Sequence, residues 1–243
     1  MIGQTARRVW TFPRLRIGLL IASACLVAYA VLPQVAYAGY WTGGEKGIPG
    51  YSDPFYALGA RQAIETQRPM YWDPWSGCNS EWVGEASYPF SNANIAQIGY
   101  GVVEIIYTDP TWFWEFDCDA TDYHPGPQFF GSPPTIGTSY AYAMYRDTTL
   151  WHGTINGVQK VHTGVDNISW RPNSTQGFGE TWVSSDHFAG TTGNHVSFTG
   201  QSWWDGSAWH GGVLYQWHIT PYGKNDITSS SGQGSWTQWD SRD

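Results

Sequence analysis

Two polar side chains in strand-like, apolar surroundings could do chemistry together. Gln97 lies within residues 95–101 and Glu180 within residues 177–182, far apart along the chain. An amide and a carboxyl on one face of a sheet can hold a water molecule between them, and the carboxyl can exchange a proton with it. That arrangement suits acid-catalysed hydrolysis of a peptide bond. We therefore predict that Gln97 and Glu180 lie side by side as a catalytic pair.

The alternation of a strand decides which side chains surround Gln97. Residues two apart share a face, so Gly99 and Gly101 lie on the same face as Gln97 and leave it uncovered. A glycine inside a strand often marks a place where a ligand or another chain comes close. The pattern favours the floor of a cleft. The alternative that it leaves open is a glutamine on a solvent-facing strand.

Glu180 has two aromatic neighbours on its own strand face, Phe178 and Trp182. Partial removal from water disfavours a charged carboxylate, so this setting is expected to raise the pKa of Glu180 toward the working range of a general acid or base. The alternative is a carboxylate with ordinary properties at the rim of the sheet.

The elements that must position these residues are short strands. The chain is rich in Trp, Tyr and Gly, with 16, 15 and 29 of them, and this composition favours strands and turns over helices. Apolar runs separated by turn residues predict strands over 82–86, 95–106, 111–116, 139–145, 150–155, 158–163, 179–185, 195–199, 213–219 and 236–239. Their close spacing is typical of a β-sandwich, jelly roll or barrel.

Local signals add three features to this organisation. Asn156-Gly157 between two extended runs predicts a two-residue hairpin with a type I′ turn. The apolar positions of residues 56–66 predict one short helix. Residues 39–76 show no sustained period, so we predict that they form an ordered N-terminal arm around a β-sandwich domain over 77–243.

Residues 1–38 have the features of a secretory signal. A basic start is followed by an apolar stretch over 17–32 and by the small-x-small site Ala36-Tyr37-Ala38. We predict a signal peptide over 1–38 and a secreted, extracellular protein; an uncleaved N-terminal anchor is the alternative.

Removal of this segment makes the chain strongly acidic. The segment holds four of the 12 basic residues and none of the 20 acidic ones, which leaves 8 against 20 and a net charge of −12. We expect a monomer that binds no nucleic acid and, after signal cleavage, no membrane.

Two cysteines, Cys78 and Cys118, remain outside the signal segment, which contains Cys25. Exported proteins oxidise such pairs, so we predict a disulfide between Cys78 and Cys118; two buried thiols are the alternative. The bridge would close a loop of about 40 residues and contribute roughly 4 kcal/mol in the chain-entropy model.

Four short motifs occur in an order that resembles the secreted glutamic peptidases of the eqolisin type. They are Glu81-Trp82-Val83-Gly84, Ala96-Gln97-Ile98-Gly99, Trp112-Phe113-Trp114-Glu115-Phe116 and Gly179-Glu180. The order is also similar, more distantly, to neprosin-like domains, in which a second glutamate takes the place of Gln97. The resemblance extends from Cys78 to Gly193, and the glutamine at position 97 is nearer to the eqolisin pattern.

The resemblance implies a fold and a set of roles. The fold is an all-β, concanavalin-like jelly-roll sandwich of two antiparallel sheets, whose concave face binds an extended peptide. Glu180 would activate water as general base and then protonate the leaving amine, while Gln97 would orient the water and stabilise the oxyanion. Trp82, Glu115 and Trp182 would bind the peptide or protein substrate. Neither a cofactor nor a metal is implied.

The chain departs from the family pattern just after Gly84. The family's strand continues Ile-Asp-Gly, whereas this chain has Glu85-Ala86-Ser87, so a familiar acidic neighbour is missing or displaced to Glu85. Eqolisins also commonly carry a propeptide, and here the fold is predicted to begin soon after the signal. The expected function is therefore a secreted, acid-acting glutamic endopeptidase or an inactive relative of one.

Other function classes leave weaker traces in the sequence. Glu81 and Glu85 share a strand face, but positions four apart lie about 13 Å from each other, farther than the two carboxyls of a glycosidase. The seven histidines form no zinc motif. The tryptophans at 203, 204, 209, 217, 236 and 239 either fill a core or stack on sugar rings. The alternative function is a secreted, non-catalytic carbohydrate-binding or cell-surface module.

Overall fold

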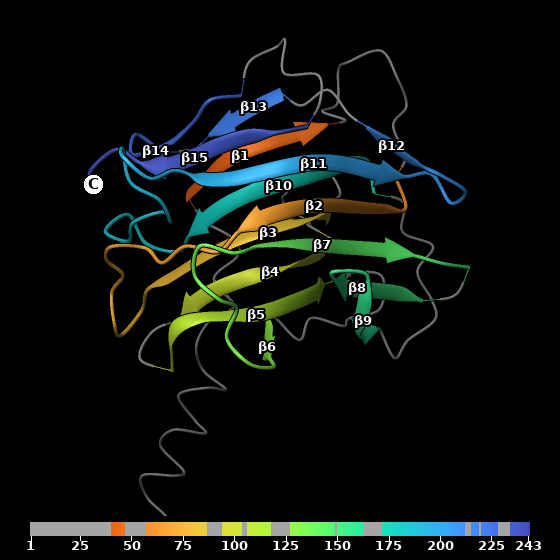
Figure 1. The fold of residues 1–243 in the computed structure, drawn as a ribbon, viewed down its shortest axis with the longest axis horizontal. Helices are drawn as coiled ribbons and strands as arrows, with labels where there is room; N and C mark the ends of the chain where they lie inside the picture. Colours follow the sequence, from red (N-terminus) through yellow and green to blue (C-terminus); the bar gives the residue numbers. More distant parts are fainter. Residues whose placement is uncertain are drawn as a thin grey trace, which may run out of the picture. The chain divides into compact units, whose positions relative to one another are not determined.

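Two antiparallel β-sheets account for the regular structure of the part of the chain that the computed structural model describes (Figure 1). That part comprises residues 40–46, 57–86, 94–103, 106–117, 127–148, 150–162, 172–211, 215–218, 220–227 and 234–243. No helix in these ranges is long and apolar enough to cross a membrane. The predicted signal over 1–38 lies outside them and stays a prediction.

The first sheet has seven strands within the described ranges. In spatial order they are β13 (Tyr215–His218), β1 (Tyr40–Lys46), β10 (Ser174–Thr181), β3 (Cys78–Ala86), β4 (Ile95–Val103), β5 (Tyr107–Asp117) and β6 (Gln128–Phe130). Strands β1, β10, β3 and β4 are thus contiguous, although β10 is far from the other three in the sequence. Their contiguity places residues about 130 positions apart on neighbouring strands.

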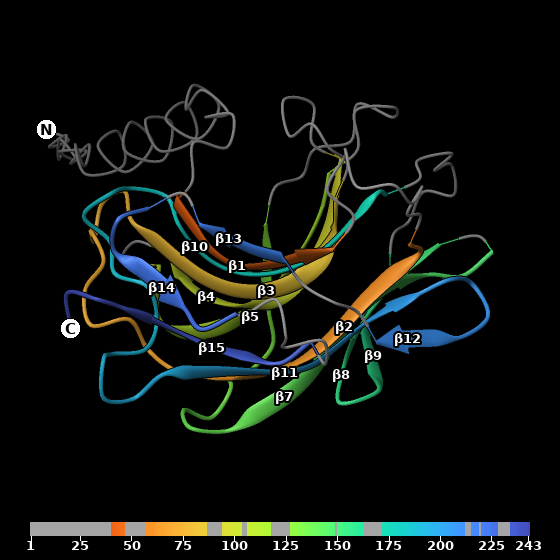
Figure 2. The same cartoon turned by 90° about the horizontal axis from the view of Figure 1, so that it is seen from above.

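The second sheet has eight strands within the same ranges. In spatial order they are β14 (Gly223–Asn225), β15 (Trp236–Asp240), β11 (Val196–Trp204), β2 (Gly59–Glu65), β7 (Ser139–Arg146), β8 (Trp151–Ile155) and β9 (Val158–His162), with β12 (Trp209–Gly211) paired to β11. Figure 2 shows this sheet lying against one side of the seven-stranded sheet.

The core fills the space between the two sheets. Val83 and Ile98 from the seven-stranded sheet pack in one buried cluster with Ile64, Met144 and Phe198 from the eight-stranded sheet. Each of these strands alternates, so the residues next to them in sequence point to the outside of the sandwich. The all-β sandwich of two antiparallel sheets that the sequence predicts is confirmed.

The predicted hairpin at residues 156 and 157 is also confirmed. Asn156 and Gly157 join β8 to β9 with φ angles of 51° and 75°, as a type I′ turn requires. The Asn156 side chain accepts a hydrogen bond from the Ala141 backbone N–H at 2.8 Å, which fixes the turn to β7.

The helix predicted over residues 56–66 is wrong. Residues 59–65 form β2, a central strand between β11 and β7. Ala60, Gln62 and Ile64 face the core, whereas Arg61 is exposed on the other face. Pairing and burial between two strands outweigh the local helix propensity of the alanines, so the segment forms a strand with a side-chain period of two.

Within the predicted arm, two described segments are strands, β1 in the first sheet and β2 in the second. Strand β1 pairs with β10 and β13 in the first sheet, and β2 pairs with β11 and β7 in the second. The sequence also missed β6, β12 and β14, which have three residues each. Strand β10 begins five residues before the predicted start at residue 179.

A substitution in β2 distinguishes a central strand from an arm. We expect Ile64→Ala to lower the free energy of unfolding by about 2–5 kcal/mol, because Ile64 is buried in the core between the sheets. Ala63→Ser, on the opposite face of β2, is the matched control and is expected to change it by less than about 0.5 kcal/mol. Denaturant unfolding measures both; equal small effects would contradict the central position of β2.

Candidate active site

The two faces of the seven-stranded sheet have different surroundings. One face packs on the eight-stranded sheet, and the other carries a separate apolar cluster that includes Trp82, Phe113 and Phe178. Figure 2 shows that this sheet is bowed, with its hollow side turned away from the eight-stranded sheet. We refer to this side as the outer face. Gln97 and Glu180 both belong to it, because they alternate in phase with residues of its cluster.

A row of polar side chains crosses the outer face over five strands. Gly84 of β3 lies opposite Gln97 of β4 on one side and opposite Gln176 of β10 on the other. Gln97 in turn lies opposite Glu115 of β5, and Gln176 lies opposite Glu45 of β1. Directly opposed residues point to the same face. The register thus builds one polar row, Glu45–Gln176–Gly84–Gln97–Glu115, with a carboxyl at each end and a glycine in the middle.

Gln97 and Glu115 form a hydrogen-bonded amide–carboxyl pair at one end of the polar row. Nε2 of Gln97 donates to Oε2 of Glu115, and both side chains are buried. This bond uses one of the two N–H groups of the Gln97 amide. Oε1 of Gln97 is buried and accepts no hydrogen bond. The pair therefore retains one donor and one acceptor that can serve a bound molecule.

Glu45, Ser174 and Gln176 form a second hydrogen-bonded group at the other end of the row. Oγ of Ser174 and Nε2 of Gln176 both donate to Oε1 of Glu45, the latter at 3.3 Å. Burial raises the pKa of Glu45, and the hydrogen bonds from Ser174 and Gln176 oppose that rise. The second oxygen of Glu45 is buried and has no hydrogen-bond partner.

Aromatic side chains form the next row along the outer face. Trp82 lies opposite Phe178 on one side and opposite Gly99 on the other, and the Trp82 and Phe178 rings meet edge to face at 5.4 Å. Phe113 lies opposite Gly99 on the following strand. A Cβ at Gly99 would lie 2.8 Å from the Cα and Cβ of Trp82, so only glycine allows Trp82 to occupy its position.

Glu180 belongs to this aromatic environment and not to the polar row. Its Oε2 accepts a hydrogen bond from Nε1 of Trp82 at 3.1 Å. Burial raises the pKa of Glu180, and hydrogen bonds from Trp41 and Trp82 oppose that rise. The raised pKa expected from the sequence therefore has the expected cause. Trp182, also expected near the site, follows β10 and is 42% exposed.

The expectation that Gln97 and Glu180 share a water is wrong. They lie on the same face, but Gln97 is opposite Gly84 of β3 and Glu180 is opposite Ser80. Four positions along β3 and two strand spacings separate their Cα atoms by about 16 Å. The side-chain period of two predicts the face of each residue correctly. It carries no information on the register, which makes Gln176 the residue across from Gln97.

The predicted disulfide joins Cys78 of β3 to Cys118, which follows β5 in the sequence. Cys78 is buried and lies opposite Val103, whereas Asp117, the residue before Cys118, lies opposite Ile95. Ile95 and Val103 are at the two ends of β4, about 26 Å apart. A disulfide requires Cα atoms within about 7 Å. Cys118 itself lies outside the described residues, so the disulfide stays a prediction.

The two glutamates that flank Trp82-Val83-Gly84 point into the sandwich. Glu81 accepts hydrogen bonds from the Ala189 backbone N–H and from Nε2 of Gln238, and Glu85 accepts one from Thr175. Burial raises the pKa of both carboxyls well above the ordinary value, and the hydrogen bonds oppose this. Glu85 therefore does not replace the acidic neighbour that the family pattern has beyond Gly84 on the outer face.

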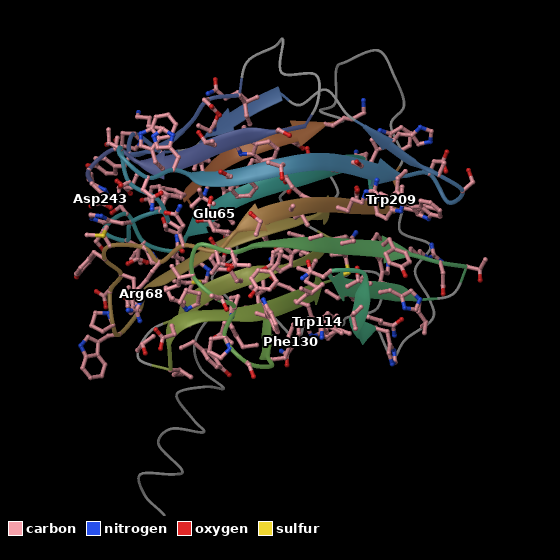
Figure 3. All side chains as sticks on the ribbon, in the orientation of Figure 1. Glu65, Arg68, Trp114, Phe130, Trp209 and Asp243 are labelled. Atoms are coloured by element: carbon pink, nitrogen blue, oxygen red, sulfur yellow. The ribbon has the colours of Figure 1, made fainter. Side chains whose placement is uncertain are left out.

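The aromatic series near the C-terminus has two environments. Trp236 is buried in the core and stacks on Phe198 at 4.9 Å, as a core role requires. Trp209, at the end of the eight-stranded sheet (Figure 3), is only partly buried and lies 4.7 Å beneath the guanidinium of Arg61. The side chain of Trp217 lies outside the described residues.

One group of potential metal ligands occurs in the described part of the chain, His187, Asp240 and Asp243. Both oxygens of Asp240 already accept hydrogen bonds from the guanidinium of Arg242, at 2.8 and 2.7 Å. A cation placed there would face the positive charge of Arg242, so this group offers no good metal site.

The sequence analysis missed the hydrogen-bonded group of Glu45, Ser174 and Gln176 at the β1 end of the polar row. Ser174 and Gln176 precede the predicted strand, although the alternation Ser174-x-Gln176-x-Phe178-x-Glu180 would have placed all four on one face. Glu45 was missed because residues 39–76 were assigned to an arm. Glu45 follows two glycines in an aromatic segment, and nothing in this local sequence indicates which residue lies opposite it on the next strand.

Comparison with known proteins identifies the fold. Neither the family models nor the curated proteins contain a match to this sequence. Among solved structures, scytalido-glutamic peptidase with a peptide-based transition-state analogue matches with a TM-score of 0.55 and 15% identity, covering 84% of this chain and 98% of that one. SCP-B, an eqolisin-family peptidase in a complex with the tripeptide Ala-Ile-His, matches with a TM-score of 0.54 and 12% identity over the same shares.

The chain has the fold of the eqolisin glutamic peptidases. The resemblance noted from four short motifs is thereby confirmed for the architecture. At this level of identity the glutamic-peptidase fold is all that the match establishes, and the chemistry must be argued from the polar row itself.

The buried carboxyls of this glutamic-peptidase fold make its stability depend on pH. The pKa values of Glu45, Glu81, Glu85 and Glu180 are all raised above the ordinary 4.5. The folded state therefore binds more protons than the unfolded state above pH 4.5. Their stabilising contribution is complete below that pH and is lost as the pH rises through the folded pKa values. We expect a higher melting temperature at about pH 4.5 than at about pH 8.

Glu81→Gln tests the cause of this dependence, because a glutamine has the same shape and no charge to lose. We expect this variant to show a smaller fall in melting temperature toward alkaline pH, and the exposed Asp109→Asn to behave like the wild type. Asp240 acts in the opposite sense. Burial raises its pKa, but hydrogen bonds from Arg242 and Phe188 outweigh burial, so the pKa of Asp240 is lowered from the ordinary 3.8. Its stabilising contribution is lost only as the pH falls below about that value. A melting temperature that rises from pH 4.5 to 8 would contradict the assignment.

Proposed function

We propose that this chain is an acid-acting glutamic endopeptidase that hydrolyses peptide bonds of an extended substrate on the outer face of the seven-stranded sheet. The observation that carries this proposal is the Gln97–Glu115 pair, an amide and a carboxyl hydrogen-bonded on neighbouring strands beside Gly84. The glutamic-peptidase fold supports it, because the pair lies on the hollow side of that fold.

The pair can perform hydrolysis by moving one proton of the attacking water to the leaving nitrogen. Glu115 accepts a proton from a water molecule, and the water oxygen forms a bond to the carbonyl carbon of the peptide. The Gln97 N–H that Glu115 does not use donates to the resulting oxyanion. The C–N bond then breaks as Glu115 returns the proton to the leaving nitrogen, so Glu115 ends in its starting state. Glu115, which the sequence assigned to substrate binding, is thus the catalytic carboxyl of this proposal.

The aromatic row supplies the binding surface for the substrate. Trp82, Phe113 and Phe178 form a buried cluster next to the polar row on the same face. In this proposal their rings contact the apolar side chains that flank the scissile bond. Trp182 continues this face beyond Glu180 and is partly open to solvent. Glu180, held by Trp82, has a substrate-binding role in this arrangement.

The buried carboxyls of the interior suit an acidic working range. Carboxyls with raised pKa values keep their protons, and their stabilising effect, in weak acid. Export, proposed on the basis of the signal-like residues 1–38, would deliver the chain to compartments where such conditions occur.

Hydrolysis of an unfolded protein and of a fluorogenic peptide library at about pH 3–5 tests the proposal. We expect Gln97→Ala and Glu115→Gln each to lower kcat/KM by about 10²–10³-fold, the usual effect of removing one catalytic donor or base. Glu180→Gln should lower it by about tenfold or less, because Glu180 lies about 16 Å from Gln97.

Asp109→Asn, with a side chain 63% exposed on β5, is the control for loss of a carboxylate without loss of the site. Folding of every variant is checked by its melting temperature. Full activity of Glu115→Gln combined with loss of activity in Glu180→Gln would overturn the assignment of Glu115. The proposal as a whole would be overturned by an inert, folded wild type across this pH range.

A further inference from the structure

Near the far end of the polar row, Gln176 uses the donors of its amide within the row itself. Nε2 of Gln176 donates to Oε1 of Glu45 at 3.3 Å and to Oγ of Ser174 at 2.9 Å, which uses both of its N–H groups. Ser174 also donates to Glu45, so the three side chains close a hydrogen-bonded ring. The ring fixes the orientation of the Gln176 amide and occupies its two donors, so the carbonyl oxygen is the one amide function that the ring does not use.

This ring is costly to bury and has no evident structural need. Glu45, Ser174 and Gln176 are each at most 1% exposed, and the second carboxyl oxygen of Glu45 has no hydrogen-bond partner. An apolar residue at position 45 would avoid the desolvation of that oxygen. The retention of a buried carboxyl next to a polar row indicates a task for the amide that it holds.

The spacing of the row suits a peptide main chain. Gln176 and Gln97 are separated by two strand spacings, about 10 Å, which an extended chain covers in about three residues. Gly84 lies between them and presents no side chain. A Cβ at Gly84 would come within 2.9 Å of the Cα and Cβ of Gln97, so the glycine also fixes how closely β3 and β4 approach.

We propose that Glu45 and Ser174 are positioning residues that hold the Gln176 amide so that its carbonyl oxygen accepts a main-chain N–H of the bound peptide, about three residues from the scissile bond. This inference rests on the proposed function, since it places the scissile bond at Gln97 and Glu115. This contact makes the protein selective for long, extended peptides, because it recognises the main chain of the peptide and none of its side chains.

Substrates that lack one N–H test this contact. A set of peptides in which single amide bonds are replaced by esters removes one main-chain donor at a time while keeping the chain length. With the wild type we expect one such ester, about three residues from the cleaved bond, to raise KM by roughly fivefold to tenfold and to leave kcat nearly unchanged. Peptides too short to reach that position should show a KM as high as the ester peptide.

Gln176→Met, which keeps the length of the side chain and removes the acceptor together with the donors to Glu45 and Ser174, is the matched variant. We expect its KM for the normal peptide to equal that of the wild type for the ester peptide, with no further rise for the ester. Glu45→Ala and Ser174→Ala should reduce the same discrimination in part. Equal ester effects in wild type and Gln176→Met, or a fall in kcat alone, would overturn the inference.

Binding separates this inference from the proposed function. The affinities of the Glu115→Gln protein for the normal and the ester peptide are measured by calorimetry at about pH 4, where no cleavage is needed. A preference for the normal peptide that disappears in Gln176→Met supports the inference even if the wild type hydrolyses nothing. Hydrolysis by the wild type with no such preference would leave the proposed function intact and refute the role of Gln176.

Discussion

The register of β3 against β4 and β10 is the constraint on which the site depends. It makes Gly84 the shared opposite residue of Gln97 and Gln176, and Trp82 the shared opposite residue of Gly99 and Phe178. The close approach at Gly84 and Gly99 leaves no room for a Cβ, so a shift of the ladder by two residues would bring side chains into those contacts. The polar row and the aromatic row are therefore two consequences of one alignment.

The fold could be predicted further than the site. Alternating runs predicted most of the strands, and Asn156-Gly157 predicted a turn that the backbone angles confirm. β2 was misread as a helix because its alanines have a local helix propensity, whereas its strand state comes from β11 and β7, which are distant in sequence. The side-chain period of a strand and the residues of a turn are local properties that can be recognised in the sequence. The pairing partners of a strand are distant in the sequence and cannot be recognised in this way.

The candidate site shows the same division. The face of Gln97 and the aromatic setting of Glu180 followed from the side-chain period of two, and both are as expected. The partner of Gln97 did not follow from it, because Glu115 lies opposite Gln97 only through the pairing of β4 with β5, and Gln176 lies opposite Gly84 only through the pairing of β10 with β3. Glu45 could not be placed at all, because its partner lies 131 residues away. The order of the motifs can predict the architecture, but the pairing of the strands decides which two residues can act as a catalytic pair.

The central claim is that the carboxyl partner of Gln97 is Glu115 and not Glu180. The most direct test is a crystal structure of the protein with a peptide-based transition-state analogue, in which the distances from Nε2 of Gln97 to both carboxyls are measured. We expect about 3 Å to Glu115 and more than about 10 Å to Glu180, with the analogue over Gly84. A Glu180 carboxyl within hydrogen-bonding distance of Gln97, with Glu115 turned away, would contradict the account.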